Sequence, residues 1–187
     1  MKALHHVIIK SDHTYNNKVG SFSVNTSIDN VESINREATV VVAPKNTDLN
    51  PGDVVIVHHN IMRENMRIDK TKTRGNFYIG NNHYWCPVSE VLMKKDPNGS
   101  WDPLGNFLFV RPIKQENIEL MGGLTLIPRS RKGMQELRAE VAIKNSKMLD
   151  IEVGDKVYMS NNSEHEFIID GEVLFKCEIE DIIGVYE

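Results

Sequence analysis

The sequence predicts an all-β protein made of two tandem small β-barrels. Three observations carry this prediction. Short runs rich in Val, Ile, Phe and Tyr recur along the 187 residues, separated by Gly, Asn, Asp or Pro, which is typical of small barrels or sandwiches. Long helical patterns are missing. The runs also return in the same order in the second half of the chain, which indicates an internal repeat.

The first copy supplies five expected strands. Val, Ile and aromatic residues dominate these runs, which favours pleated, half-buried strands. Twelve of the 25 residues from 11 to 35 are Ser, Thr or Asn, so a loop is expected after the first strand. In chain order, the expected strands are HHVIIK at 5–10, ATVVVA at 38–43, DVVIVHH at 53–59, YWCPV at 84–88 and EVLM at 90–93.

The second copy follows a turn-rich linker at residues 96–105, which holds two Asp-Pro pairs within a few positions of Asn-Gly. Its expected strands are FLFVRPI at 107–113, LTLI at 124–127, AEVAIK at 139–144, KVYM at 156–159, EFII at 166–169, EVLFKCEI at 172–179 and DIIGVY at 181–186.

The two copies align at two offsets. The first strand and the Gly-Asp turn match at an offset of 102, and the closing strands match at an offset of 91. The difference of 11 predicts extra residues in the first copy, within the charged stretch at 62–80. We therefore expect a first barrel at 1–95 and a second at 106–187. The matched pairs are 5–9 with 107–111, 51–55 with 153–157, and 85–92 with 176–183.

Composition excludes several classes of protein. The formal net charge of -4 does not indicate a nucleic-acid partner, and no apolar run is long enough to span a membrane. The apolar segment within the first residues is too short for a signal peptide. Two cysteines, Cys86 and Cys177, do not make a disulfide framework, and we expect both to be buried small hydrophobes. These features favour the cytoplasm.

No catalytic or metal site is expected. The sequence has no nucleophile elbow, P-loop or dinucleotide fingerprint. Adjacent histidines on a strand, such as His58 and His59, point to opposite faces and should not chelate together. His83 and Cys86 form the best remaining pair, and nothing nearby completes a tetrahedral set. We therefore expect no enzyme activity, no metal and no cofactor.

The stretch LMGGLTLIPRS at 120–130 is unusual. Gly122 and Gly123 allow a loop to swing, yet the apolar residues that follow lie between polar flanks. Apolar side chains on a mobile loop are favourable when they enter an apolar groove. The alternative is that residues 124–127 form a barrel strand and the glycines its turn. The residues alone leave both interpretations open.

The second copy resembles the co-chaperonin (GroES) family over residues 106–187. FLFVRPI, the polar KQENIE, the Gly-Gly-apolar loop, RAEVAIK, VGDKVYM and VLFKCEIEDIIGVYE follow the family's order. The resemblance implies a homo-oligomeric ring that caps an ATP-bound chaperonin ring, with ATP hydrolysed by the chaperonin. It also implies a chaperonin-binding site made of Gly122, Gly123, Leu124, Thr125, Leu126 and Ile127.

The first copy departs from the family pattern. It keeps NPGDVVIV and YWCPVSEVLM, but residues 11–35 lack the Gly-Gly-apolar signature. We therefore expect the first copy to be mainly architectural. Both copies lack the hairpin that forms the family's roof, so the dome is expected to be open. This divergence suggests a viral or phage version acting in host cytoplasm. The alternative function is a structural or binding β-barrel module, such as a virion component or a nucleic-acid binder, without chaperonin binding.

Overall fold

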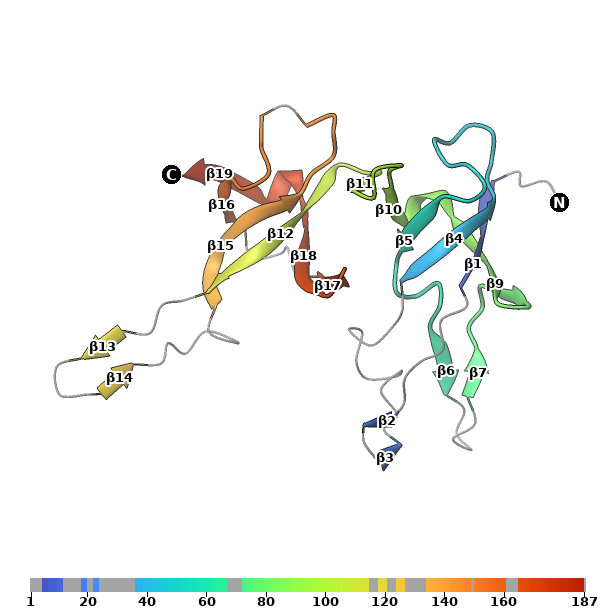
Figure 1. Cartoon of the computed structure of the whole chain (residues 1–187), viewed down its shortest axis with the longest axis horizontal. Helices are drawn as coiled ribbons and strands as arrows, with labels where there is room; N and C mark the ends of the chain where they lie inside the picture. Colours follow the sequence, from blue (N-terminus) through green and yellow to red (C-terminus); the bar gives the residue numbers. More distant parts are fainter. Residues whose placement is uncertain are drawn as a thin grey trace. The chain divides into compact units, whose positions relative to one another are not determined.

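The computed structural model describes most of the chain and confirms the all-β prediction. The elements it describes are β-strands with two short 3-10 helices (Figure 1). In the part of the chain it describes, no helix is long and apolar enough to cross a membrane. The described residues are 5–11, 18–19, 22–23, 36–66, 72–114, 118–120, 124–126, 134–148, 150–160 and 165–186.

The chain divides into two compact units, unit 1 at 1–105 and unit 2 at 106–187. Unit 1 contains an antiparallel sheet with the strand order β11-β10-β5-β4-β1-β9-β8. A 3-10 helix, η2 (Val88–Glu90), lies between β9 and β10. The strands are β1 (His6–Lys10), β4 (Glu37–Val42), β5 (Val54–Val57), β8 (Tyr78–Gly80), β9 (His83–Pro87), β10 (Val91–Lys95) and β11 (Trp101–Pro103).

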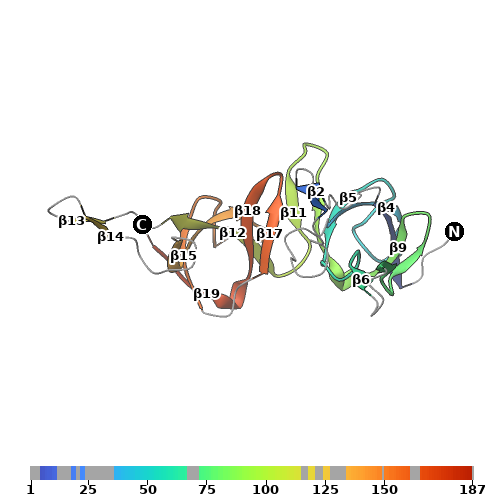
Figure 2. The same cartoon turned by 90° about the horizontal axis from the view of Figure 1, so that it is seen from below.

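Unit 2 repeats this arrangement. Its antiparallel sheet has the order β17-β18-β12-β15-β16-β19, which matches β8-β9-β1-β4-β5-β10 strand for strand. In Figure 2 the strands of each unit curve around that unit's own interior. The strands are β12 (Phe107–Lys114), β15 (Met134–Ile143), β16 (Lys156–Met159), β17 (His165–Ile169), β18 (Glu172–Glu178) and β19 (Ile182–Tyr186), with η4 (Ile179–Asp181) before β19.

Strand register corrects one offset of the sequence alignment. Val7 pairs with Cys86, and Leu108 pairs with Cys177. Since the two cysteines are 91 residues apart, Val7 corresponds to Leu108, at an offset of 101 rather than the expected 102. The expected match was wrong by one residue, which would have turned every inward side chain of that strand outward.

The Gly-Asp turns keep the expected offset of 102. Gly52 has a φ of 96° and donates its N–H to the Val40 carbonyl, and Gly154 has a φ of 95° and donates to the Val141 carbonyl. Val40 and Val141 are themselves 101 residues apart. One residue is therefore inserted in unit 2 between the second barrel strand and its Gly-Asp turn.

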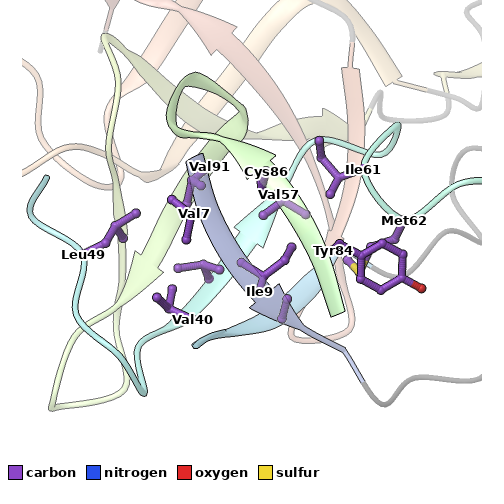
Figure 3. Close-up of a cluster of buried hydrophobic side chains, with 12 residues drawn as sticks. Val7, Ile9, Val40, Leu49, Val57, Ile61, Met62, Tyr84, Cys86 and Val91 are labelled. Carbon is purple, nitrogen blue, oxygen red and sulfur yellow. The ribbon is translucent and has the colours of Figure 1, made fainter. Parts of the chain in front are cut away.

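The core of each unit consists mainly of the inward residues of these strands, joined by residues of the connecting segments such as Ile61 and Ile151. Alternation along β1 buries Val7 and Ile9 fully, and the corresponding Leu108 and Val110 are equally buried on β12. Figure 3 shows the unit 1 cluster, with Val7, Ile9, Val40, Val57, Cys86 and Val91 converging from five strands. The unit 2 cluster contains Leu108, Val110, Ala139, Val141, Met148, Ile151, Val157 and Cys177.

Both cysteines are fully buried, as expected, and neither is in a disulfide. Each sulfur lies close to the carbonyl oxygen of the next residue, at 3.3 Å for Cys86 and 3.4 Å for Cys177. Burial, followed by the charge of Glu90, raises the pKa of Cys86 to about 12. The Cys86 thiol is therefore protonated at neutral pH.

Several short strands lie where loops or linker were expected, and one of them is β8, within the stretch at 62–80. β6 (Glu64–Met66) and β7 (Lys72–Arg74) pair within the stretch at 62–80. β2 (Lys18–Val19) and β3 (Phe22–Ser23) pair between β1 and β4. β11 pairs with β10 and continues the sheet of unit 1. By contrast, the described residues between β4 and β5, and between β15 and β16, contain turns and no strand.

Candidate functional site

The apolar residues of the unusual stretch form a strand outside the barrel sheet. β14 (Leu124–Leu126) pairs with β13 (Ile118–Leu120), and the two make a two-stranded sheet of their own, labelled in Figure 1. This hairpin connects β12 to β15 along the chain. Thus residues 124–126 are extended, but they are not one of the strands of the six-stranded sheet of unit 2. Gly122, Gly123 and Ile127 lie outside the described residues.

The register of this hairpin groups its apolar positions. Ile118 lies opposite Leu126, Leu120 opposite Leu124, and Glu119 opposite Thr125. Opposite residues of an antiparallel pair share a face, and neighbours along a strand alternate between faces. One face therefore carries four aliphatic positions and the other carries Glu119 and Thr125.

The sequence analysis did not predict the strand β13. Ile118 lies in KQENIE, which was interpreted as a polar lead-in to the loop, and Leu120 is the first residue of the stretch at 120–130. The signal that could have found them is the Ile-Glu-Leu alternation, which is the pattern of a strand with one apolar face.

A smaller hairpin occupies the corresponding place in unit 1. Val19 lies opposite Phe22, and Lys18 lies opposite Ser23. Because both hairpins lie between the first barrel strand and the second, they are equivalent in topology. The unit 1 hairpin has two residues in each strand and lacks the leucine-rich sequence of β14.

The last strand of unit 2 carries exposed apolar side chains at the edge of its sheet. In the sheet order β19 pairs with β16 alone, whereas β10, its equivalent in unit 1, lies between β5 and β11. Ile183 is 72% exposed and Val185 is 50% exposed. Leu92, the residue of unit 1 that corresponds to Ile183, is 5% exposed. The position of Ile183 is thus exposed in unit 2, whereas its equivalent in unit 1 is buried.

Aromatic rings extend this open region. The Tyr158 and Tyr186 rings lie 4.4 Å apart between centroids, and the Arg138 guanidinium lies 5.0 Å from the Tyr158 ring and 5.5 Å from the Tyr186 ring. Interfaces between proteins are enriched in aromatic residues and arginine. The β15-β16-β19 surface therefore has a composition suited to contact with another chain.

His58 and His59 do not lie on a strand, which corrects the expectation from the sequence. β5 ends at Val57, so His58 and His59 follow the strand instead of alternating on it, and their ring centroids are 4.1 Å apart. His58 Nδ1 lies 3.6 Å from Glu90 Oε2. His83 Nδ1 lies 2.7 Å from the Asn81 carbonyl oxygen. Among the described residues no group of three or more His, Cys, Asp or Glu side chains could hold a metal ion.

Comparison with known proteins gives relatives of one kind. The chain is similar to the co-chaperonin GroES of Thermotoga neapolitana and of Thermotoga maritima, with 37% identity over 89 residues in each case. It is 34% identical over 87 residues to the co-chaperonin GroES of Kosmotoga olearia. These alignments span 46% of this chain and 94% of each relative. No protein-family model matches the chain. Each relative therefore corresponds in length to about one unit.

Proposed function

The chain belongs to the GroES co-chaperonin family, and from this membership we propose that it is a co-chaperonin that docks on a chaperonin ring through the β13–β14 hairpin. Members of this family are not enzymes. In the proposed reaction the chaperonin hydrolyses ATP, and this chain caps the ATP-bound ring and assists folding. The observation that carries the proposal is that Leu124–Leu126 form a strand of a separate two-stranded sheet, outside the six-stranded sheet of unit 2. In the sequence this strand falls between β12 and β15, two neighbouring strands of the six-stranded sheet.

The proposed docking site comprises Gly122, Gly123, Leu124, Thr125, Leu126 and Ile127. Burying each large aliphatic side chain stabilises the complex by roughly 1.5 to 3 kcal/mol, while ordering the loop costs about 1 to 2 kcal/mol per fixed residue. The two contributions nearly cancel, so one hairpin binds weakly. Several hairpins on one ring gain about 10² to 10⁴ in avidity. Weak multiple contacts suit a cap that must also be released.

We further propose that the chain forms a homo-oligomeric ring through the open face of β19. Ile183 and Val185 are exposed there, while the corresponding position of unit 1, Leu92, is buried. An exposed edge strand with apolar residues invites pairing with another chain. A second copy of this chain is the proposed neighbour, because a ring of several copies holds several weakly binding hairpins together.

We propose the domains expected from the sequence: a first barrel at 1–95, a connecting segment at 96–105 and a second barrel with the docking hairpin at 106–187. The connecting segment also supplies β11 to the sheet of unit 1. The proposed location is the cytoplasm, because Cys86 and Cys177 are not joined in a disulfide and disulfides are rare in reducing compartments. The relatives give no support to a viral or phage origin, and none is proposed.

The proposal is tested by chaperonin binding of Leu126→Asp with Thr125→Asp as its matched control. Position 126 shares the aliphatic face, and position 125 lies on the opposite face. An aspartate in an apolar groove is strongly unfavourable, so Leu126→Asp should abolish ATP-dependent co-elution with a chaperonin while Thr125→Asp retains it. If the unmodified chain does not co-elute with a chaperonin under ATP, the co-chaperonin proposal is wrong and the binding-module alternative takes its place.

A further inference from the structure

We propose that the His58–Glu90 pair of unit 1 is a pH-sensitive switch, which ties the end of β5 to the 3-10 helix η2 more tightly when His58 is protonated. Unit 2 has an equivalent contact between Ser160 and Asp181, which contains no histidine. The inference concerns the closure of unit 1, and it does not depend on the proposed chaperonin partner.

The backbone places the two contacts at the same point of the two units. The N–H of His58 donates to the carbonyl of Glu90 at 2.9 Å, and the N–H of Ser160 donates to the carbonyl of Asp181 at 2.8 Å. His58 and Ser160 are 102 residues apart, which is the offset of the Gly-Asp turns. Glu90 and Asp181 are 91 residues apart, which is the offset of the two cysteines. Each bond therefore ties the residue after β5 or β16 to the 3-10 helix before the next strand of the sheet.

The side chains of the two contacts differ in their chemistry. In unit 2 the Ser160 hydroxyl donates to Asp181 Oδ1 at 2.7 Å, and a hydroxyl keeps its proton near neutral pH. In unit 1 His58 Nδ1 lies 3.6 Å from Glu90 Oε2, so the two side chains attract as opposite charges only when the imidazole is protonated. Because a histidine ordinarily titrates near pH 6.5, the unit 1 contact changes in a range where the unit 2 contact does not.

His58 Nδ1 lies near two groups that need opposite protonation states. The N–H of Asn60 donates to Nδ1 at 3.3 Å, which requires a lone pair on that nitrogen. The Glu90 carboxylate favours a proton there. Protonation therefore exchanges the bond from Asn60, within the same turn, for an ion pair that reaches η2. Contacts with an ionised partner are roughly twice as strong as neutral ones, so the exchange favours the folded state of unit 1.

The other groups around His58 add no second step in this range. The His59 ring lies 4.1 Å from the His58 ring between centroids, which disfavours a proton on both rings together. Arg36, whose carbonyl accepts a hydrogen bond at the end of β5, is charged throughout. Burial, followed by the charge of Glu90, raises the pKa of Cys86 to about 12, so this thiol stays neutral.

The sign of the effect follows from proton linkage. A group that binds its proton more tightly in the folded state stabilises the fold below its unfolded titration range, and this stabilisation is lost as the pH rises. Unit 1 should therefore close more tightly near pH 5.5 than near pH 7.5, on either side of the ordinary histidine value of about 6.5. The Ser160–Asp181 contact of unit 2 should be insensitive over the same range.

The first experiment follows the His58 ring and the Asn60 amide of the full chain by NMR as the pH is changed. The Asn60 amide should shift with the same midpoint as the His58 ring, because it loses its acceptor when Nδ1 is protonated. Glu90→Gln keeps the size of the side chain and removes its charge, so it should lower that midpoint by about 0.3 to 0.7 pH units. An Asn60 amide that does not follow the ring, or an unchanged midpoint in Glu90→Gln, would overturn the proposal.

The second experiment compares hydrogen exchange at the His58 and Ser160 amides, which donate the two equivalent backbone bonds. After division by the intrinsic exchange rates, protection of the His58 amide should be about two- to threefold higher near pH 5.5 than near pH 7.5, as expected for a partly exposed ion pair. Protection of the Ser160 amide should be the same at both pH values.

The matched control is His58→Ser with Glu90→Asp, which installs the residues of unit 2 in unit 1. This variant should keep the protection at position 58 seen near pH 7.5 and lose its dependence on pH. Equal changes at positions 58 and 160 in the unmodified chain would indicate a response of the whole chain, and no change at either position would indicate no switch. Either result would show that the proposal is wrong.

Discussion

At the scale of single residues, the reactivity of Cys86 and Cys177 reports how tightly the core of each barrel is packed. Both are fully buried at equivalent positions, and burial raises the pKa of Cys86 to about 12. The thiolate is the reactive species, so we expect neither cysteine to react with a thiol reagent in native buffer. In denaturant both should react at once. A thiol titration checks this, and rapid native labelling of one cysteine would contradict the burial described for its unit.

Arg111 on β12 links its two neighbouring strands through ion pairs. Its Nη1 lies 2.5 Å from Glu140 Oε1, and its guanidinium also pairs with the carboxylate of Glu172. The hydrogen bond from Arg111 is the main cause that lowers the pKa of Glu172, and the same bond raises the pKa of Arg111. Since the folded pKa of Glu172 is below its unfolded value, its stabilisation is present above about pH 4.3 and is lost as the pH falls through the folded pKa.

Glu172→Gln should therefore reduce the free energy of unfolding of unit 2 at neutral pH and leave it unchanged in strong acid. The side chains are about 40% exposed, so solvent screening limits the effect to about 1 kcal/mol or less. Urea unfolding at several pH values measures this. Glu180→Gln, on η4, removes the same charge and should cost less at neutral pH. A loss of stability that persists below the folded pKa would contradict the ion-pair explanation.

At the scale of elements, the Gly-Asp turn closes both barrels in the same way. Gly52 and Gly154 have positive φ values of 96° and 95°, and an added Cβ would meet nothing within 4 Å at either site. Alanine at either position should therefore cost only backbone strain, about 1 to 2 kcal/mol. Chemical denaturation of Gly52→Ala and Gly154→Ala should show similar losses in their own units. A loss several times larger at one turn would mean that the two turns are not equivalent.

The main barrel strands were predictable because they follow a simple pattern. β1, β4, β5, β9 and β10, with their equivalents in unit 2, are runs of β-branched and aromatic residues whose inward members fill a core. Register was less predictable, because alternating apolar residues allow a match shifted by one position. Pairing of Val7 with Cys86 resolved that ambiguity.

The short strands were missed for a different reason. They have two or three residues each, which is too few for periodicity to distinguish a strand from a loop; they are β2, β3, β6, β7, β8 and β11. β13 also has only three residues, and it was missed for the same reason. The segment at 124–127 was recognised because leucines stand out after Gly-Gly, whereas Ile118 and Leu120 are separated by Glu119 and become notable only when β14 is placed opposite them.

At the scale of the whole molecule, the proposed ring predicts that Ile183 matters for assembly and little for folding. Ile183 is 72% exposed, and Val153, at the Gly-Asp turn of the same unit, is 60% exposed. Exposed substitutions usually change stability by about 0.5 kcal/mol or less, so neither Ile183→Lys nor Val153→Lys should unfold unit 2. Only Ile183→Lys should convert the oligomer to monomers in light scattering. A monomeric unmodified chain at micromolar concentration would rule out the ring.

Each unit has one buried cysteine in its core, so thiol labelling can report the opening of each barrel separately. Each thiol becomes available to a labelling reagent when its barrel opens, and mass spectrometry of the resulting peptides distinguishes Cys86 from Cys177. Under conditions in which opening and closing are fast, each labelling rate reports the opening equilibrium of one barrel. Equal rates that respond together to Gly52→Ala would identify a single cooperative folding unit. Separate rates, with only Cys86 accelerated, would identify two barrels that open independently on one polypeptide.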